Sequence, residues 1–153
     1  AVPTAPFLAT GHLGREQIAN LAAALERYGR EGLFRVVMVH HPPISKPGRH
    51  FKRLVDGSEF RAMLARQGAE LVIHGHDHVH SLIELAGPQG RIPIVGAPSA
   101  SAVTPGRNDG AGYNLYRIDG GRDGWRCETI WRGLAGDGRE VVEIKRIRLP
   151  GAG

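Results

Sequence analysis

The sequence is poor in cysteine and in long apolar runs. Its one cysteine, Cys127, excludes an internal disulfide bond and fits a reducing compartment. No stretch reaches the ~18 consecutive apolar residues that a membrane-spanning helix needs. From these two absences we expect a cytoplasmic protein that has no membrane partner.

Acidic residues are in the minority, with 15 Asp and Glu against 20 Lys and Arg, and the formal net charge is +5. An excess of positive charge can serve nucleic-acid binding. However, the basic residues form no block of like charge and do not alternate with aromatic residues. We therefore expect a solvated basic surface and no specific nucleic-acid partner. Nucleic-acid binding is the function that we favour least for this chain.

The chain has 153 residues, of which 41% are hydrophobic and 23% charged. These values predict a single domain over residues 1–153 with a core of its own. The first residue is Ala1 rather than Met. We expect the chain to begin after processing, after trimming, or within a longer gene.

The first half alternates between two sequence patterns. Apolar residues at helical spacing predict a helix over residues 14–29 that has Tyr28 on its apolar face and ends at Gly29. The run 33–40 is rich in β-branched residues and predicts a strand covered on both faces. A proline-rich loop follows.

A second helix is predicted over residues 58–67, with Asp56 or Ser58 as its N-cap and Gly68 as its end. The run 69–74 then predicts another buried strand. A helix–strand, helix–strand order is typical of parallel strands joined by crossovers.

After residue 80 the pattern changes to short strands separated by glycine-rich turns, which is typical of antiparallel pairing. One predicted strand places Trp125, Cys127, Thr129 and Trp131 on the same face. The predicted fold class is α/β, with helix–strand crossovers in residues 14–74 followed mainly by antiparallel strands.

Histidines follow both buried strands of the first half. The stretch "HHPP" begins at His40, and "LVIHGHDHVH" contains His74, His76, His78 and His80. In open α/β sheets, sites gather outside the carboxyl ends of the strands. Imidazole is the commonest neutral metal ligand, so the two stretches are candidates for one metal site.

Spacing narrows the choice of ligands. In extended backbone, residues i and i+2 project the same way, so His76 and His78 could reach neighbouring ions together. Gly75 interrupts the strand and separates His74, which we expect to pack or hydrogen-bond at the strand end. Asp77 is either a partner that holds an imidazole or a solvent-facing turn residue.

Three other histidines are expected to lie outside the site. The outgoing strand should carry His80 away from it, and His12 and His50 are expected to be ordinary hydrogen-bonded residues. In the loop after "HHPP", Lys46 and Arg49 either touch phosphate or belong to a solvated basic loop.

Together, "VVMVHHPPI" and "VIHGHDHVH" resemble the calcineurin-like metallophosphoesterases, which place His-x-Pro after one strand and G-H-x-H after the next. The resemblance is firmest over residues 33–100. It implies that His40 and His76 bind one metal ion and that His78 binds the other. His40 stands in the His-x-Pro register; His41 is the alternative ligand, or it lines the substrate pocket.

Three motifs of that family are missing: D-x-H, G-D-x-x-D and G-N-H followed by Asp or Glu. The sequence has one "GD", Gly136–Asp137, which lies between late strands, and none of its three asparagines precedes a histidine. In the family these motifs come first. The resemblance therefore implies the C-terminal portion, or second half, of a metallophosphoesterase-type α/β sandwich.

The activity that the resemblance implies is hydrolysis of phosphate esters, above all small-molecule phosphodiesters, by two divalent ions of Mn, Fe or Zn. No catalytic residue is identified on this chain. Neutral imidazoles do not offset the charge of two close ions, so we expect the chain alone to hold at most one ion and to turn over little. A non-catalytic metal-binding module is the alternative.

The absent first half has a structural consequence. It would leave strand edges and an apolar face exposed, and such surfaces tend to pair. We therefore expect a homo-oligomer, or pairing through the surface that the missing half would cover.

Overall fold

The computed structural model describes residues 2–3, 9–44, 53–102, 109–121, 124–136 and 138–150. The elements in chain order are β1 (Val2–Pro3), β2 (Gly11–His12), α1 (Arg15–Arg30), β3 (Val36–Val39), α2 (Gly57–Gln67), β4 (Leu71–His74), β5 (Ser81–Gly87), β6 (Gly90–Gly96), β7 (Gly112–Gly121), β8 (Gly124–Leu134) and β9 (Val141–Arg148). This mixture of helices and two larger sheets confirms the α/β class. Within the described residues, no helix is both long and apolar enough to cross a membrane.

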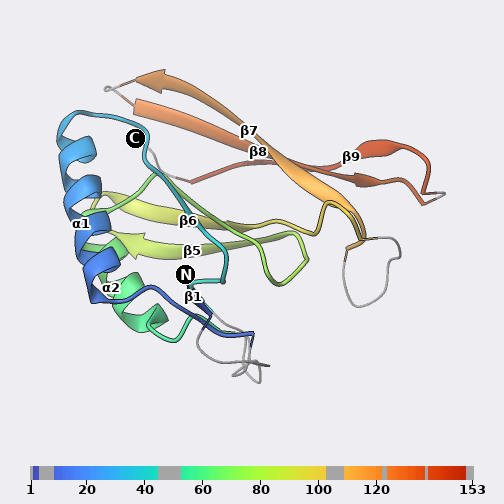
Figure 1. Ribbon diagram of the computed structural model, residues 1–153. Coiled ribbons are helices and arrows are strands. Elements are labelled where there is room, and N and C mark those ends of the chain that lie inside the picture. Colours follow the sequence, from blue (N-terminus) through green and yellow to red (C-terminus); the bar gives the residue numbers. More distant parts are fainter. Residues whose placement is uncertain are drawn as a thin grey trace.

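The elements form three layers (Figure 1). The central sheet has the order β3-β4-β6-β5, in which β3, β4 and β6 run parallel and β5 pairs antiparallel with β6. Helices α1 and α2 cover one face of it, and the antiparallel sheet β7-β8-β9 packs on the other. The predicted change from parallel to antiparallel pairing along the chain is confirmed.

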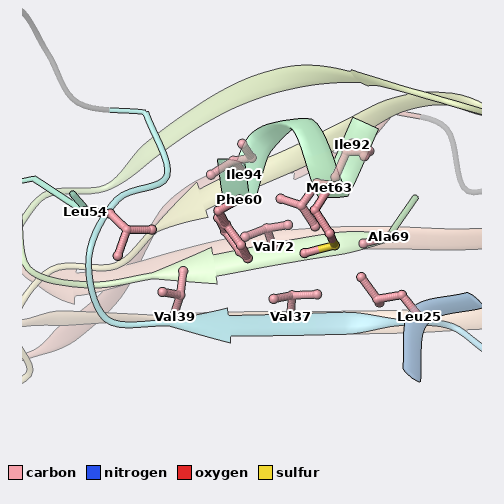
Figure 2. Packing of buried hydrophobic residues seen from close by; sticks show 11 residues of the cluster. Leu25, Val37, Val39, Leu54, Phe60, Met63, Ala69, Val72, Ile92 and Ile94 are labelled. Atoms are coloured by element: carbon pink, nitrogen blue, oxygen red, sulfur yellow. The ribbon is translucent and has the colours of Figure 1, made fainter. Parts of the chain in front are cut away.

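The larger core lies between the helices and the central sheet. Figure 2 shows Phe60 and Met63 of α2 pointing onto Val72 in the middle of that sheet. Leu25 of α1 reaches the same core from the side. Apolar side chains on one face of α2 thus bury it against the central sheet.

A second core lies between the two sheets. Leu71 and Val95 of the central sheet meet Cys127 of β8 and Leu149. Cys127 and Thr129 are both buried, which confirms the predicted inward face of β8. Burial raises the pKa of the Cys127 thiol to about 11, so the thiol stays protonated and unreactive at neutral pH.

Helix α1 ends one residue later than predicted, and Gly29 is not its stop. The chain leaves the helix through Gly32, at φ 73°, with Leu33 N–H donating to the Tyr28 carbonyl. A Cβ on Gly29 would lie 2.7 Å from a guanidinium nitrogen of Arg35, so glycine is needed there for packing. Tyr28 is 41% exposed, contrary to its predicted place on the apolar face.

Helix α2 follows Asp56 and ends at Gly68, which has φ 77°, as predicted. The Asp56 side chain, however, does not cap α2. Its Oδ2 accepts N–H bonds from Leu13 and Gly14, at 3.0 and 2.8 Å, at the start of α1. Burial acts to raise the pKa of this carboxyl, but those hydrogen bonds outweigh burial and the net pKa is lowered.

The prediction that β3 is covered on both faces is wrong. Val37 and Val39 are buried under the helices, but Val36 and Met38 on the opposite face are 45% and 81% exposed. The reason is position: β3 lies at the edge of the central sheet, and the second sheet leaves this part of its face open.

The starts of β3 and β4 are joined by a buried ion pair. The Arg35 guanidinium contacts the Glu70 carboxylate at 2.7 Å and also donates to the carbonyls of Leu25 and Gln67. Glu70 in turn accepts from the Arg35 backbone N–H. One pair of side chains thus ties both helices to both strands.

We predict that Glu70→Ala lowers the free energy of unfolding by about 3–5 kcal/mol, because it leaves the buried Arg35 charge without its partner. Urea denaturation measures this loss. The matched control is Glu26→Ala, whose pair with Arg30 has the same 2.7 Å distance but is solvent-exposed. The control should cost less than about 1 kcal/mol, and equal losses would contradict the prediction.

We also predict that the chain self-associates along β3. Its outer edge has no strand partner among the described residues, and its four residues carry neither charge nor proline to discourage pairing. Light scattering at rising concentration should show dimers or larger species. Met38→Lys should favour monomers, whereas Ile144→Lys on edge strand β9 should not; a monomer at every concentration would overturn the idea.

Candidate functional site

The candidate site lies where β3 and β4 end. The two strands pair in parallel with Val39 opposite His74, so the chain leaves both strands at the same level. Gly75 N–H donates to the His40 carbonyl at 3.1 Å, which extends the pairing one step beyond the strands. The predicted meeting of "HHPP" and "HGHDH" at one sheet edge is therefore confirmed.

Three imidazoles come together at this edge, and we call His40, His41 and His76 the histidine cluster. His76 Nδ1 lies 3.2 Å from His40 Nε2. The His41 ring centroid is 5.0 Å from that of His40 and 4.5 Å from that of His76. His40 and His76, which are 36 positions apart in the sequence, are thus in direct contact.

The backbone after β4 differs from the predicted one. His76 and His78 have φ of 66° and 56°, in the left-handed region that non-glycine residues seldom adopt. The expectation of extended backbone here is wrong, because Asp77 N–H bonds to the Gly75 carbonyl at 2.8 Å and closes a tight turn. Such backbone costs about 1–3 kcal/mol per residue and is frequent at functional sites.

His78 lies apart from the histidine cluster. Its side chain is exposed, and its carbonyl accepts the Asp109 N–H. Among the described residues, ring contacts join His40, His41 and His76 to one another, and His78 takes part in none of these three contacts. As the candidate ligand of a second ion, His78 would share that ion with groups outside the histidine cluster.

His41 is buried within the cluster. Its Nε2 lies 3.2 Å from the Ala9 carbonyl, and its Nδ1 has no hydrogen-bond partner in the described part of the chain. Burial, and then the neighbouring His40, lower the pKa of His41. His41 is therefore neutral at neutral pH, which is the form in which imidazole binds a metal ion or accepts a proton.

His74 is buried at the strand end and donates through Nδ1 to the Gly75 carbonyl at 3.0 Å, as expected from the break at Gly75. Burial lowers the pKa of His74, while the nearby carboxylate of Asp77 acts to raise it. Asp77 thus acts electrostatically on the His74 imidazole.

The remaining histidines lie elsewhere. His80 stacks on Trp131 at 4.9 Å between centroids and bonds to Asn114, so the outgoing strand carries it to the second sheet as expected. His12 is exposed beside Asp56. Lys46, Arg49 and His50 lie outside the described residues.

A pocket of about 490 Å³ opens between the two sheets beside His40. Sequence analysis missed it, because four of its thirteen lining residues come from β7, 70 or more residues after β3. The only signal was the alternation that turns Asn114 and Tyr116 inward, opposite Trp131 and Thr129. The lining residues are Met38, Val39, His40, Ile73, His74, Gly75, Ala97, Pro98, Ala100, Gly112, Tyr113, Asn114 and Tyr116.

The histidine cluster fits part of a metal coordination sphere. His40 and His76 are joined by a hydrogen bond between ring nitrogens 3.2 Å apart. Two nitrogens that each lie about 2.1 Å from one tetrahedral zinc ion stand about 3.4 Å apart, so an ion replacing the shared proton would require little change in this separation. Within the described residues, however, no group of three or more His, Cys, Asp or Glu side chains is arranged to hold an ion. An ion bound between His40 and His76 would therefore have two ligands from the cluster, and its other ligands would be water or groups outside the cluster.

Comparisons with known proteins identify no family for this chain. No protein-family model matches the sequence, and no curated protein is similar to it. Among solved structures, the chain is similar to a double mutant of Vps29 from Entamoeba histolytica, with 14% identity and a TM-score of 0.39. The similarity covers 61% of this chain and 45% of that one, so the matched part is less than half of the Vps29 chain.

We predict that stability falls as the pH drops below about 6.5, the ordinary pKa of histidine. The pKa values of His41 and His74 are lowered in the folded state, so the unfolded chain takes up protons first. Urea midpoints at pH 7.5 and 5.5 measure the effect. His74→Gln should reduce it, whereas His12→Gln at an exposed site should not; an unchanged midpoint in the parent chain would contradict the prediction.

Proposed function

We propose that this chain carries the histidine side of a two-metal phosphoesterase site. The function is metal-dependent hydrolysis of phosphate esters, with small-molecule phosphodiesters as the preferred substrates. The observation that carries the proposal is the 3.2 Å approach of His76 Nδ1 to His40 Nε2 at the ends of two adjacent parallel strands. The resemblance assigns the same two residues to one ion and His78 to the other.

The role of the chain follows from its donors. A bound pair of divalent ions, Mn, Fe or Zn, supplies an activated water and neutralises the charge of the reacting phosphate. His40 and His76 would hold one ion beside the pocket, and the unusual backbone at His76 keeps its ring next to His40. All these donors are neutral, so the chain alone is expected to hold one ion weakly.

Metal binding provides the first test. We predict that Mn²⁺ or Zn²⁺ binds the chain in calorimetric titration at pH 7.5 and that His40→Ala and His76→Ala each weaken binding at least about tenfold. Binding should fade below about pH 6, because protonated imidazole cannot bind a metal ion. His12→Ala is the matched control, and equal affinities for all four proteins would contradict the assigned ligands.

Turnover provides the second test, with bis-p-nitrophenyl phosphate and Mn²⁺. The 153-residue chain should show little or no hydrolysis, and the complete product of its gene should hydrolyse the ester until His76 is replaced by Ala. Rapid turnover by the 153-residue chain would contradict the need for further carboxylates. A complete product that binds metal but hydrolyses no phosphate ester would instead favour the non-catalytic metal-binding module.

A further inference from the structure

We propose that the pocket beside His40 binds the organic group of the phosphate ester and that it favours an aromatic group of one or two rings. This inference rests on the proposed function, because it places the phosphate at the histidine cluster. The metal ligands alone do not determine which phosphate esters bind, whereas the pocket would select esters that carry an aromatic group.

The first reason is position. His40 belongs both to the cluster and to the wall of the pocket, and Gly75, which precedes His76, lines it as well. A phosphate held at the cluster would therefore have its ester oxygen at one end of the pocket. The attached group could extend between the sheets toward Tyr113 and Pro98.

The second reason is the chemistry of the wall. None of the thirteen lining residues is Asp, Glu, Lys or Arg, and most of the wall is apolar or aromatic, including Met38, Ile73 and Tyr116. Such a wall binds an uncharged, desolvated group and disfavours a second phosphate. The volume of about 490 Å³ lies within the range of small-ligand pockets, roughly 300–1,000 Å³.

The third reason is that the β7 wall is already ordered. The Asn114 side chain bonds to His80, to the Gly96 carbonyl and to the Tyr116 hydroxyl, at 2.9, 3.1 and 3.3 Å. A Cβ on Gly112 would lie 2.7 Å from the Arg132 carbonyl oxygen, so glycine permits the close approach of this wall. A rigid pocket binds its ligand without first losing side-chain entropy.

The open side of the pocket is apolar as well. Met38 is 81% exposed and Tyr113 is 41% exposed. A methionine side chain adapts to the shape of a ligand and makes favourable contacts with aromatic rings. A bound ring would cover apolar surface that is now in contact with water.

The experiment compares phenyl phosphate with inorganic phosphate on the Mn²⁺-loaded chain by calorimetric titration. Phenyl phosphate should bind roughly tenfold or more tightly, because its ring leaves water. Ala100→Trp places a large ring into the pocket from an exposed loop residue and should abolish this preference while inorganic phosphate binds as before. Ala62→Trp, on the exposed side of α2, is the matched control and should keep the preference.

Phenol, which carries no phosphate, separates the two proposals. Added to the metal-free chain, it should shift the NMR amide signals of Tyr113 and Asn114, and Ala100→Trp should remove the shifts. If phenol binds the chain but metal ions do not, the proposed function is wrong and the pocket proposal stands. If phenyl phosphate and inorganic phosphate bind with equal affinity and phenol shifts no amide signals, the pocket proposal is wrong and the proposed function stands. A change of oligomeric state in Ala100→Trp without phenol binding would make the pocket part of a contact between copies and would also overturn it.

Discussion

The candidate site depends on the register of one pair of strands. At the amino ends of β3 and β4, Arg35 and Glu70 form a buried ion pair and are also joined by hydrogen bonds that involve the backbone. These contacts fix β3 against β4. Four residues later the same register brings Val39 opposite His74, and His40 then meets His76. A slip of one residue would turn the side chains of one strand to the other face and separate the two imidazoles. The ion pair, at the opposite end of the strands, therefore positions His40 and His76.

The break at Gly75 explains why two histidines only two residues apart have different roles. His74 still belongs to the strand, and its ring is buried and bonded to the backbone. His76 lies beyond the break in left-handed backbone, next to a ring from the neighbouring strand. The strained turn persists because the Gly75 N–H and carbonyl are both bonded, to His40 and to Asp77. The fold thus stabilises a conformation that histidine alone would avoid.

Local patterns predicted most of the fold, and contacts distant in sequence account for what they missed. Spacing of apolar residues placed α1 and α2, and β-branched runs placed β3 and β4. Exposure of Met38 depends on which strands lie beside and above it, which no local pattern records. The actual role of Asp56 depends on partners 42 and 43 residues away. In the site, the rule that parallel strands end at one edge united His40 and His76. Left-handed backbone at His76 could not be predicted from residue type, because histidine adopts it more often than most residues but still in only a minority of cases.

The two deficits of this chain lie at the same place. Within the part of the chain that the structure describes, no carboxylate joins the histidine cluster in a metal-holding group, and β3 has no strand on its outer edge. Strand β4 shows what such a neighbour does, since a strand in parallel register delivers the residues after its carboxyl end to the cluster. A further strand pairing in parallel with the outer edge of β3 would end beside His40 in the same way, and acidic residues after it would lie next to His40 and His76. Under the proposed function, the strand that completes the sheet would therefore also be the strand that supplies the missing negative charge.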